Sequence, residues 1–193
     1  MIQTINWFII KLQLDWNDGT NMKEVKEYDN NGNLIYYKAS YGYEVWSKYD
    51  NFGKLIYYKT SNGVEEWLEY DNNSNLIYNK NSTGYEEWKE YDNNCNLIHY
   101  KDSNGFESWK EYDNNDNLIH YKDSNRFEKW FEYDNNNLIH YKDSNGFECW
   151  REYDSNNNLI HYRNSDGFES WSEYDNNICI HYKTSTGIEE WYN

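Results

Sequence analysis

Five histidines at one position of a repeated segment are the residues best suited to chemistry: His99, His120, His140, His161 and His181. Imidazoles ligate metals and transfer protons near neutral pH, so such a row could bind ions or relay protons. Equivalent side chains of successive β-hairpins, however, lie two strands apart, about 9.5 Å, too far to share an ion with ligands at about 2 Å. Earlier repeats have tyrosine at this position, at Tyr36, Tyr57 and Tyr78. We therefore predict an aromatic partner for tryptophan, with no metal site and no cofactor.

Loops of the type Asp29–Asn33 are rich in side-chain oxygens, as calcium-binding loops are. They lack the distant bidentate glutamate and the length of a calcium loop, and Asx turns explain them instead. No serine, cysteine or lysine stands beside a base and an orienting acid at a position that the other repeats lack. We expect no catalytic residue and no enzymatic activity.

Glutamates occupy two repeat positions. At the first, each is expected to lie beside lysine: Glu44, Glu65, Glu86, Glu107, Glu128, Glu148, Glu169 and Glu189. At the second, each is expected to face leucine with no cation: Glu69, Glu90, Glu111, Glu132, Glu152 and Glu173. Regularly spaced, unpaired carboxylates on a stiff sheet could imitate a phosphate backbone and occupy a basic cleft. They could equally serve to keep an edge-rich β protein soluble.

Tryptophans follow the same repeat, and we expect Trp88, Trp109 and Trp130 to join the second glutamate row in binding a partner. Flat aromatic rings at regular intervals also suit polysaccharides. A glycan-binding or structural scaffold protein that works through its Trp and Tyr rows is therefore the alternative.

These side chains are positioned by a 21-residue repeat, in which Tyr-Asp pairs begin at positions 28, 49, 70, 91, 112, 133, 153 and 174. One repeat holds two short runs, 97–102 and 106–112, each flanked by turn formers. The pattern predicts an all-β fold of tandem 21-residue hairpins in a long twisted antiparallel sheet. A flattened β-solenoid, with one strand of each repeat per layer, is the alternative. Shortened repeats lose a residue in the loops near 134–137 and 175–178, where strand pairing would be untouched.

The two connections of a repeat determine its register. A type I turn at Asp102-Ser103-Asn104-Gly105, closed by a left-handed glycine, sets Lys101 opposite Glu107 and His99 beside Trp109. We take the second connection, 113–116, as a four-residue loop. It would then place Trp109 opposite His120 and Glu107 opposite Lys122, so that like side chains form straight rows on one face.

Arginine replaces the turn glycine at Arg126, which we expect to strain or reshape that turn. Residues 1–25 look like a degenerate repeat, with a turn at Asp18-Gly19 and Val25 at the tryptophan position. We predict that this segment caps the repeat array 26–193 within a single domain. Terminal sheet edges offer a route to self-association.

Acidic residues outnumber basic ones by 34 to 18, for a net charge of −16. This balance disfavours direct contact with nucleic acid and indicates a partner protein with a basic surface. Three cysteines at non-equivalent repeat positions predict free thiols. The apolar run 5–10 is too short to span a membrane. We expect a cytoplasmic protein without a membrane segment.

The pattern Tyr-Asp-x-x-Gly-x-Leu is complete at 28–34 and 49–55, and it resembles the YD repeats of the RHS family. Later repeats replace its glycine with Ser74, Cys95, Asp116 and Asn157. The resemblance implies a spiralling antiparallel hairpin sheet and nothing catalytic. Eight repeats are expected to be too few for the toxin-enclosing shell that RHS proteins form, so we expect a short array without a toxin domain.

Together these features suggest a non-enzymatic, protein-binding repeat module that docks its acidic surface on a basic partner. Such a module could inhibit a nucleic-acid-handling enzyme, as phage antagonists such as anti-CRISPR proteins do.

Overall fold

The computed structural model describes residues 11–17 and 21–192. All regular secondary structure in these ranges is β-strand, and none of their segments is a helix that could cross a membrane. Contacts divide the chain into two compact units, the first of Met1–Lys89 with Asp102–Asn104 and the second of Glu90–Lys101 with Gly105–Asn193. This boundary does not correspond to the predicted one between a cap, 1–25, and an array, 26–193, which stays a prediction.

The first unit contains strands β1 (Lys11–Asn17), β2 (Asn21–Tyr28), β3 (Leu34–Ala39), β4 (Glu44–Tyr49), β5 (Leu55–Thr60), β6 (Glu65–Tyr70), β7 (Leu76–Asn81) and most of β8 (Glu86–Tyr91). The second contains most of β9 (Leu97–Asp102) and all of β10 (Glu107–Tyr112), β11 (Leu118–Asp123), β12 (Glu128–Asp134), β13 (Asn137–Asp143), β14 (Glu148–Tyr153), β15 (Leu159–Asn164), β16 (Glu169–Asp175), β17 (Ile178–Thr184) and β18 (Glu189–Trp191).

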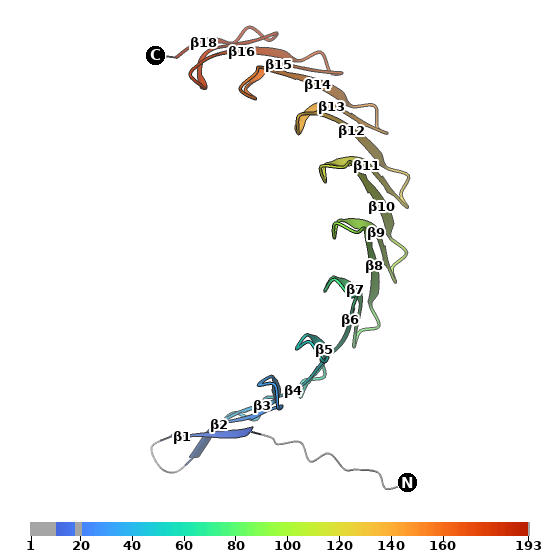
Figure 1. Ribbon diagram of the computed structural model, residues 1–193, viewed down its shortest axis with the longest axis vertical. Helices are drawn as coiled ribbons and strands as arrows, with labels where there is room; N and C mark the ends of the chain where they lie inside the picture. Colours follow the sequence, from blue (N-terminus) through green and yellow to red (C-terminus); the bar gives the residue numbers. More distant parts are fainter. Residues whose placement is uncertain (1–10, 18–20, 193) are drawn as a thin grey trace. The chain divides into compact units, whose positions relative to one another are not determined.

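Within each unit, consecutive strands pair antiparallel, and the hairpins follow one another in chain order (Figure 1). The predicted all-β array of 21-residue antiparallel hairpins is confirmed. The solenoid alternative is wrong, because it requires equivalent strands of successive repeats to be neighbours. In the described part of each unit, every such pair is separated by an intervening antiparallel strand.

The first connection of the repeat has the predicted register. In the hairpin of β9 and β10, Lys101 pairs with Glu107 and His99 with Trp109. Gly105 closes the turn in the left-handed region, with φ of 89°. Asp102 caps the same turn by accepting a hydrogen bond from the Asn104 N–H at 2.9 Å. Local turn chemistry is therefore enough to specify this half of the repeat.

The second connection differs from the prediction by two residues. Trp109 pairs with Lys122, and Glu111 pairs with His120, so the expected Trp109–His120 and Glu107–Lys122 pairs are wrong. A shift of two residues leaves every side chain on its predicted face but moves each row relative to the next hairpin.

Two local features cause this shift. The Asp113 N–H donates to the Asn117 carbonyl at 2.9 Å, so three residues and not four form the tip of the loop, with Asp116 left-handed at φ of 62°. A β-bulge then follows between Glu111 and Tyr112, where the partner strand contributes an extra residue. Each feature displaces the pairing by one position.

The shortened repeats keep this register. Asn135 and Asn136, with φ of 49° and 64°, form a two-residue loop between β12 and β13. Glu132 still pairs with His140. The prediction that the missing residue leaves strand pairing untouched is confirmed.

Val25 lies at the tryptophan position, as predicted, because it pairs with Lys38 as Trp46 pairs with Lys59. β1 and β2 form an antiparallel hairpin in front of it. The expected turn at Asp18-Gly19 lies outside the described residues.

Burial is concentrated on the face opposite the tryptophans. The side chains there include Cys149, which is 1% exposed, and the buried Ala39, Thr60, Ser108, Asp123, Asp143, Ser170 and Thr184. Three tyrosines of the Tyr-Asp pairs hydrogen-bond across their own hairpins on this side: the Tyr112 hydroxyl donates to the Leu97 carbonyl at 3.2 Å, and Tyr49 and Tyr153 make the same bond to Leu34 and Leu138. Small residues and tyrosines thus take the place of a conventional core.

Replacing Arg126 with glycine should stabilise the protein. The arginine keeps the regular turn, since its N–H donates to the Asp123 carbonyl at 3.0 Å, but its φ of 66° is unfavourable for a residue with a Cβ. The turn is strained and not reshaped. We expect Arg126→Gly to raise the free energy of unfolding by about 0.5–1 kcal/mol in urea denaturation.

The control is Gly146→Ala at the equivalent position, where φ is 92° and an added Cβ meets nothing within 4 Å. The added Cβ meets no neighbour and only disfavours the left-handed backbone conformation, so this variant should lose about 1 kcal/mol in the free energy of unfolding. A destabilised Arg126→Gly variant would contradict the account.

Candidate interaction surface

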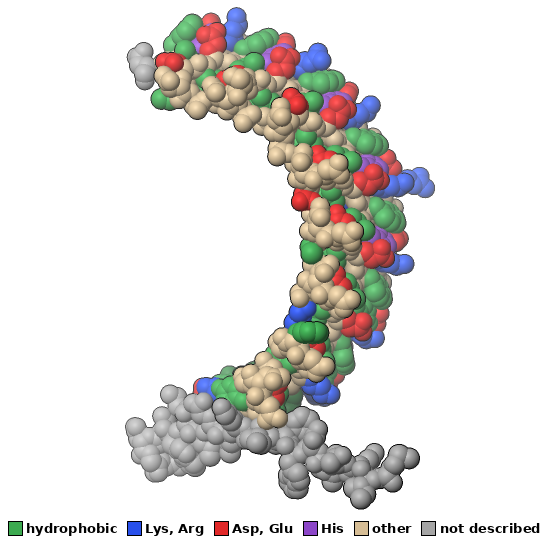
Figure 2. Space-filling model, in the orientation of Figure 1, with side chains coloured by type: hydrophobic (Ala, Val, Ile, Leu, Met, Phe, Trp, Pro, Cys, Tyr) green, Lys and Arg blue, Asp and Glu red, His purple; other side chains and the backbone are tan. Residues whose placement is uncertain are grey.

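The tryptophan face is the side of the sheet that carries the Trp, His, Lys and Glu rows. In the second unit, Trp109 stacks on His99 with ring centroids 5.4 Å apart and planes inclined by 12°. The repeats that follow show the same stacking: His120 on Trp130, His140 on Trp150 and His161 on Trp171. Figure 2 shows purple histidines beside red carboxylates and blue Lys or Arg side chains on this face. The predicted role of histidine as a tryptophan partner is thus seen.

The indole ring of Trp150 is covered on both sides. His140 lies on one side of Trp150, and the Arg163 guanidinium lies over the ring, 4.4 Å from its centroid. Sugar stacking requires an open ring face, so Trp150 is poorly placed as a glycan platform. The predicted site residues Trp88, Trp109 and Trp130 are each 39% exposed and present part of their ring to solvent.

The second glutamate row lies on the tryptophan face, but its neighbours differ from those predicted. Because of the shifted register, its members in the second unit face histidine and not leucine. The Oε1 to Nδ1 distances are 3.4 Å for Glu90 and His99, 3.4 Å for Glu111 and His120, 3.1 Å for Glu132 and His140, 3.3 Å for Glu152 and His161, and 3.5 Å for Glu173 and His181. In the first unit, Glu69 faces Tyr78. The prediction that these carboxylates face leucine is therefore wrong for the second unit.

These glutamates are nevertheless well exposed. Their side chains are 64–69% exposed in the second unit, which leaves one carboxylate oxygen and much of the side chain in water. A partner could reach them without any rearrangement of the sheet.

The other ring nitrogen of each histidine faces the first glutamate row. The Nε2 to carboxylate distances are 2.9 Å for His99 and Glu107, 3.8 Å for His120 and Glu128, 2.8 Å for His140 and Glu148, 2.8 Å for His161 and Glu169, and 3.0 Å for His181 and Glu189. Each imidazole therefore lies between two carboxylates. We call this set of five histidines and ten glutamates the histidine–glutamate row.

Sequence reasoning missed this row because it placed His120 opposite Trp109 and so left Glu111 facing leucine. The spacing of His and Glu alone carries no mark of the bulge. The left-handed residue at Asp116, which shortens the loop tip to three residues, is likewise unmarked because aspartate replaces the usual glycine there.

The two carboxylates alter the acidity of His140. Burial favours its neutral form, but hydrogen bonds and the negative charges of Glu132 and Glu148 together outweigh burial and raise its pKa above the ordinary value. The protonated ring is the form that can donate to both carboxylates.

Lysine or arginine lies opposite the first glutamate row in the strand register of each hairpin, as predicted, and four of the lysines form ion pairs with it. The Nζ to Oε1 distances are 2.6 Å for Lys38 and Glu44, 2.5 Å for Lys59 and Glu65, 2.5 Å for Lys80 and Glu86, and 3.4 Å for Lys122 and Glu128. On the other side of Glu107, however, the neighbour is Ser124, whose hydroxyl accepts the Glu107 N–H at 3.1 Å. The expectation of lysine on both sides is wrong.

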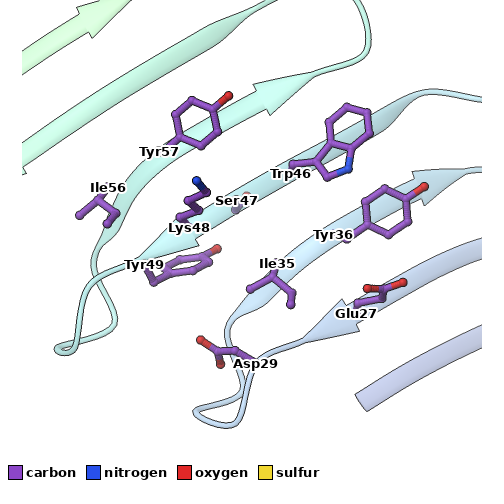
Figure 3. Close-up of a pocket in the computed structure, with 10 residues that line it drawn as sticks. All are labelled: Glu27, Asp29, Ile35, Tyr36, Trp46, Ser47, Lys48, Tyr49, Ile56 and Tyr57. Carbon is purple, nitrogen blue, oxygen red and sulfur yellow. The ribbon is translucent and has the colours of Figure 1, made fainter. Parts of the chain in front are cut away.

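The first unit has different chemistry on the tryptophan face. A groove of about 760 Å³ crosses β3 to β5 and is lined by Glu27, Asp29, Ile35, Tyr36, Trp46, Ser47, Lys48, Tyr49, Ile56 and Tyr57 (Figure 3). Tyr36 and Trp46 are 5.7 Å apart and tilted by 38°, and Lys48 takes the place that glutamate has in later repeats. The groove is lined mainly by apolar side chains, together with both acidic and basic residues, whereas the tryptophan face of the second unit carries two rows of glutamates.

The Asp-Asn loops use their carboxylates internally. Oδ1 of Asp113 accepts the N–H groups of Asn115 at 2.8 Å and Asn117 at 2.9 Å, and its Oδ2 accepts the Asn117 amide at 3.0 Å. These bonds lower the pKa of Asp113. In the described ranges, no three His, Cys, Asp or Glu side chains are grouped to hold a metal ion.

No family model matches the chain, and no curated protein is significantly similar to it. Among solved structures, the Tc holotoxin pore of Photorhabdus luminescens is similar over 88% of this chain and 12% of its own, with 13% identity and a TM-score of 0.44. The crystal structure of TcdB2-TccC3 is similar over 91% of this chain and 14% of its own, with 11% identity and a TM-score of 0.44. This chain therefore spans a small part of the proteins that it resembles. At these scores the likenesses say nothing about function.

The antiparallel hairpin repeat implied by the YD resemblance is present in both units. Membership of the RHS family itself stays a prediction.

Proposed function

We propose that this protein is a non-enzymatic, protein-binding repeat module whose second unit docks through the tryptophan face onto a basic surface of a partner. The observation that carries the proposal is the repetition of an exposed carboxylate at every hairpin, at Glu90, Glu111, Glu132, Glu152 and Glu173. The net charge of −16 also attracts a positively charged partner over long distances.

The charge balance of one hairpin supports this choice of partner. Glu107 and Glu111 lie on the face with a single lysine, Lys101, so one carboxylate per repeat is balanced only when His99 or His120 is protonated. Lysine or arginine side chains from a partner would supply that charge. The half-exposed edges of the tryptophans would add apolar contact area beside it.

The class of partner that fits is a protein with a row of basic side chains, such as the cleft of a nucleic-acid-handling enzyme. Such clefts are lined with lysine and arginine because they bind phosphates. An inhibitor of the anti-CRISPR type, acting in the cytoplasm, is the specific form that we propose. Glycan binding is less well supported because the Trp150 ring is covered on both sides.

Binding to a deca-arginine peptide tests the acidic docking surface. We expect the triple variant Glu111→Gln, Glu132→Gln and Glu152→Gln to bind the peptide about 3- to 100-fold more weakly than the wild type at low salt, since each of the three exposed ion pairs contributes about 0.2–1 kcal/mol. Wild-type affinity should fall steeply with added salt. Isothermal titration calorimetry measures both effects.

The matched control removes three other exposed carboxylates, two at the ends of β12 and β16 and one in a turn, through Asp134→Asn, Asp175→Asn and Asp166→Asn. It has the same net charge as the first variant. Equal weakening by both variants would show that only net charge matters, and the tryptophan face would lose its assigned role.

A further inference from the structure

Each histidine of the second unit lies between two carboxylates, and His140 hydrogen-bonds to both of them, whereas Nε2 of His120 is 3.8 Å from Glu128 and makes no hydrogen bond. His140 on β13 shows the arrangement most clearly, with Nδ1 3.1 Å from Glu132 of β12 and Nε2 2.8 Å from Glu148 of β14. Trp150 of β14 covers its ring at 5.4 Å. The remaining charged neighbours on this face are Lys142 of the same strand, which pairs with Glu148, and Glu152 of β14.

A neutral imidazole carries one N–H group and one lone pair, so it can donate to only one of these carboxylates. The other carboxylate then faces a lone pair and is repelled. An imidazolium donates to both and cancels one negative charge. The geometry of the row is therefore complementary to the protonated ring.

We propose that the histidine–glutamate row is a pH gate on the docking surface, closed when the histidines are protonated and open to a cationic partner when they are neutral. The inference rests on the docking function proposed above and adds its regulation. Protonated, the five histidines would place a positive charge 3.1–3.5 Å from the Oε1 atoms of Glu90, Glu111, Glu132, Glu152 and Glu173. Their deprotonation releases five negative charges along one face.

The direction of the effect follows from which state binds each proton. A basic partner competes with the imidazolium protons for the same carboxylates, so binding releases protons and strengthens as pH rises. The pKa of His140 is raised in the folded state, so its protonation also stabilises the fold. This stabilisation is complete at a pH below the pKa of the unfolded chain and is lost as the pH rises through the pKa of the folded state.

The chain supplies its own control for the gate. Tyrosine occupies the histidine position in Tyr36, Tyr57 and Tyr78, where it packs beside Trp46, Trp67 and Trp88 at 5.5–5.7 Å. A variant with all five histidines changed to tyrosine therefore keeps an aromatic ring that this fold accepts. It removes only the group that titrates near neutral pH.

The experiment measures deca-arginine affinity of the full chain between pH 5.5 and 8.5 at constant ionic strength. Arginine stays charged throughout this range, so the peptide does not titrate. We expect the wild-type protein to bind at least about tenfold more tightly at pH 8.5 than at pH 5.5, since several exposed ion pairs are released. The five-tyrosine variant should bind with the high-pH affinity at every pH. NMR titration of the imidazole carbons follows protonation independently.

Two outcomes overturn the inference and are distinguishable. If the five-tyrosine variant, or the single variant His140→Tyr should the former not fold, keeps the full pH dependence of the wild type, the gate is wrong and docking stands. For His140→Tyr, the gate predicts a partial loss of that dependence. If neither protein binds the peptide at any pH while the imidazoles still titrate, docking itself is wrong and the gate has nothing to control.

Discussion

Deletion of Lys110 should unfold the hairpins around it, whereas deletion of Asp116 should be tolerated. Side chains alternate between the two faces of a strand, so losing one residue inside β10 sends either Trp109 or Tyr112 to the wrong side. The repeat then loses either the stacking on His99 or the bond to the Leu97 carbonyl. We expect a loss of more than about 3 kcal/mol in the free energy of unfolding, comparable to removing a large aromatic side chain.

Deletion of Asp116 is the matched control because it recreates a loop that the chain already contains. The sequence becomes Tyr-Asp-Asn-Asn-Asn-Leu, which is identical to residues 133–138. That loop keeps the same strand register through Asn135 and Asn136. Urea denaturation followed by circular dichroism compares the two deletions. Equal destabilisation would show that the strand alternation is not what holds the repeat together.

Replacing Tyr112 with alanine should give the largest loss among single substitutions in a regular repeat. Its ring is half-buried on the face opposite the tryptophans, and its hydroxyl donates to the Leu97 carbonyl of the same hairpin at 3.2 Å. Burial also raises the pKa of this phenol. We expect Tyr112→Ala to lower the free energy of unfolding by about 2–3 kcal/mol, less than for a fully buried aromatic.

Tyr112→Phe separates the two contributions, since it removes only the hydrogen bond and should lose about 1 kcal/mol. Tyr41→Ala serves as the control because that side chain is 80% exposed in a turn and should change stability little. A full loss in the phenylalanine variant would place the stabilisation in the hydrogen bond and contradict the role given to the ring.

The first connection could be predicted from sequence because its determinants are local. Asp102 and Gly105 are the residues that a type I turn with a left-handed closing residue prefers, and the turn then pairs Lys101 with Glu107 without further information. The same reasoning placed Val25 at the tryptophan position. Strand order followed from the repeat, because short connections join neighbouring antiparallel strands.

The second connection could not be predicted because its geometry rests on residues that only weakly prefer it. Asp116 takes a left-handed conformation that is usual for glycine, and the bulge beside Tyr112 has no residue of its own to mark it. The face of each second-row glutamate in the second unit was therefore right, and its neighbour across the second connection was wrong. For a surface whose chemistry depends on pairs, that difference decided between isolated carboxylates and carboxylates bridged by histidine.

Contacts in the described part of each unit join only strands that are consecutive in the chain. The free energy of such an array is a sum of hairpin terms and nearest-neighbour terms, as in a one-dimensional lattice. Opening can then begin at an end hairpin and advance inward one hairpin at a time, with no central core to melt all at once. Amide hydrogens of interior hairpins should accordingly exchange more slowly than those near the ends, and the gradient along the chain would report the coupling between neighbours.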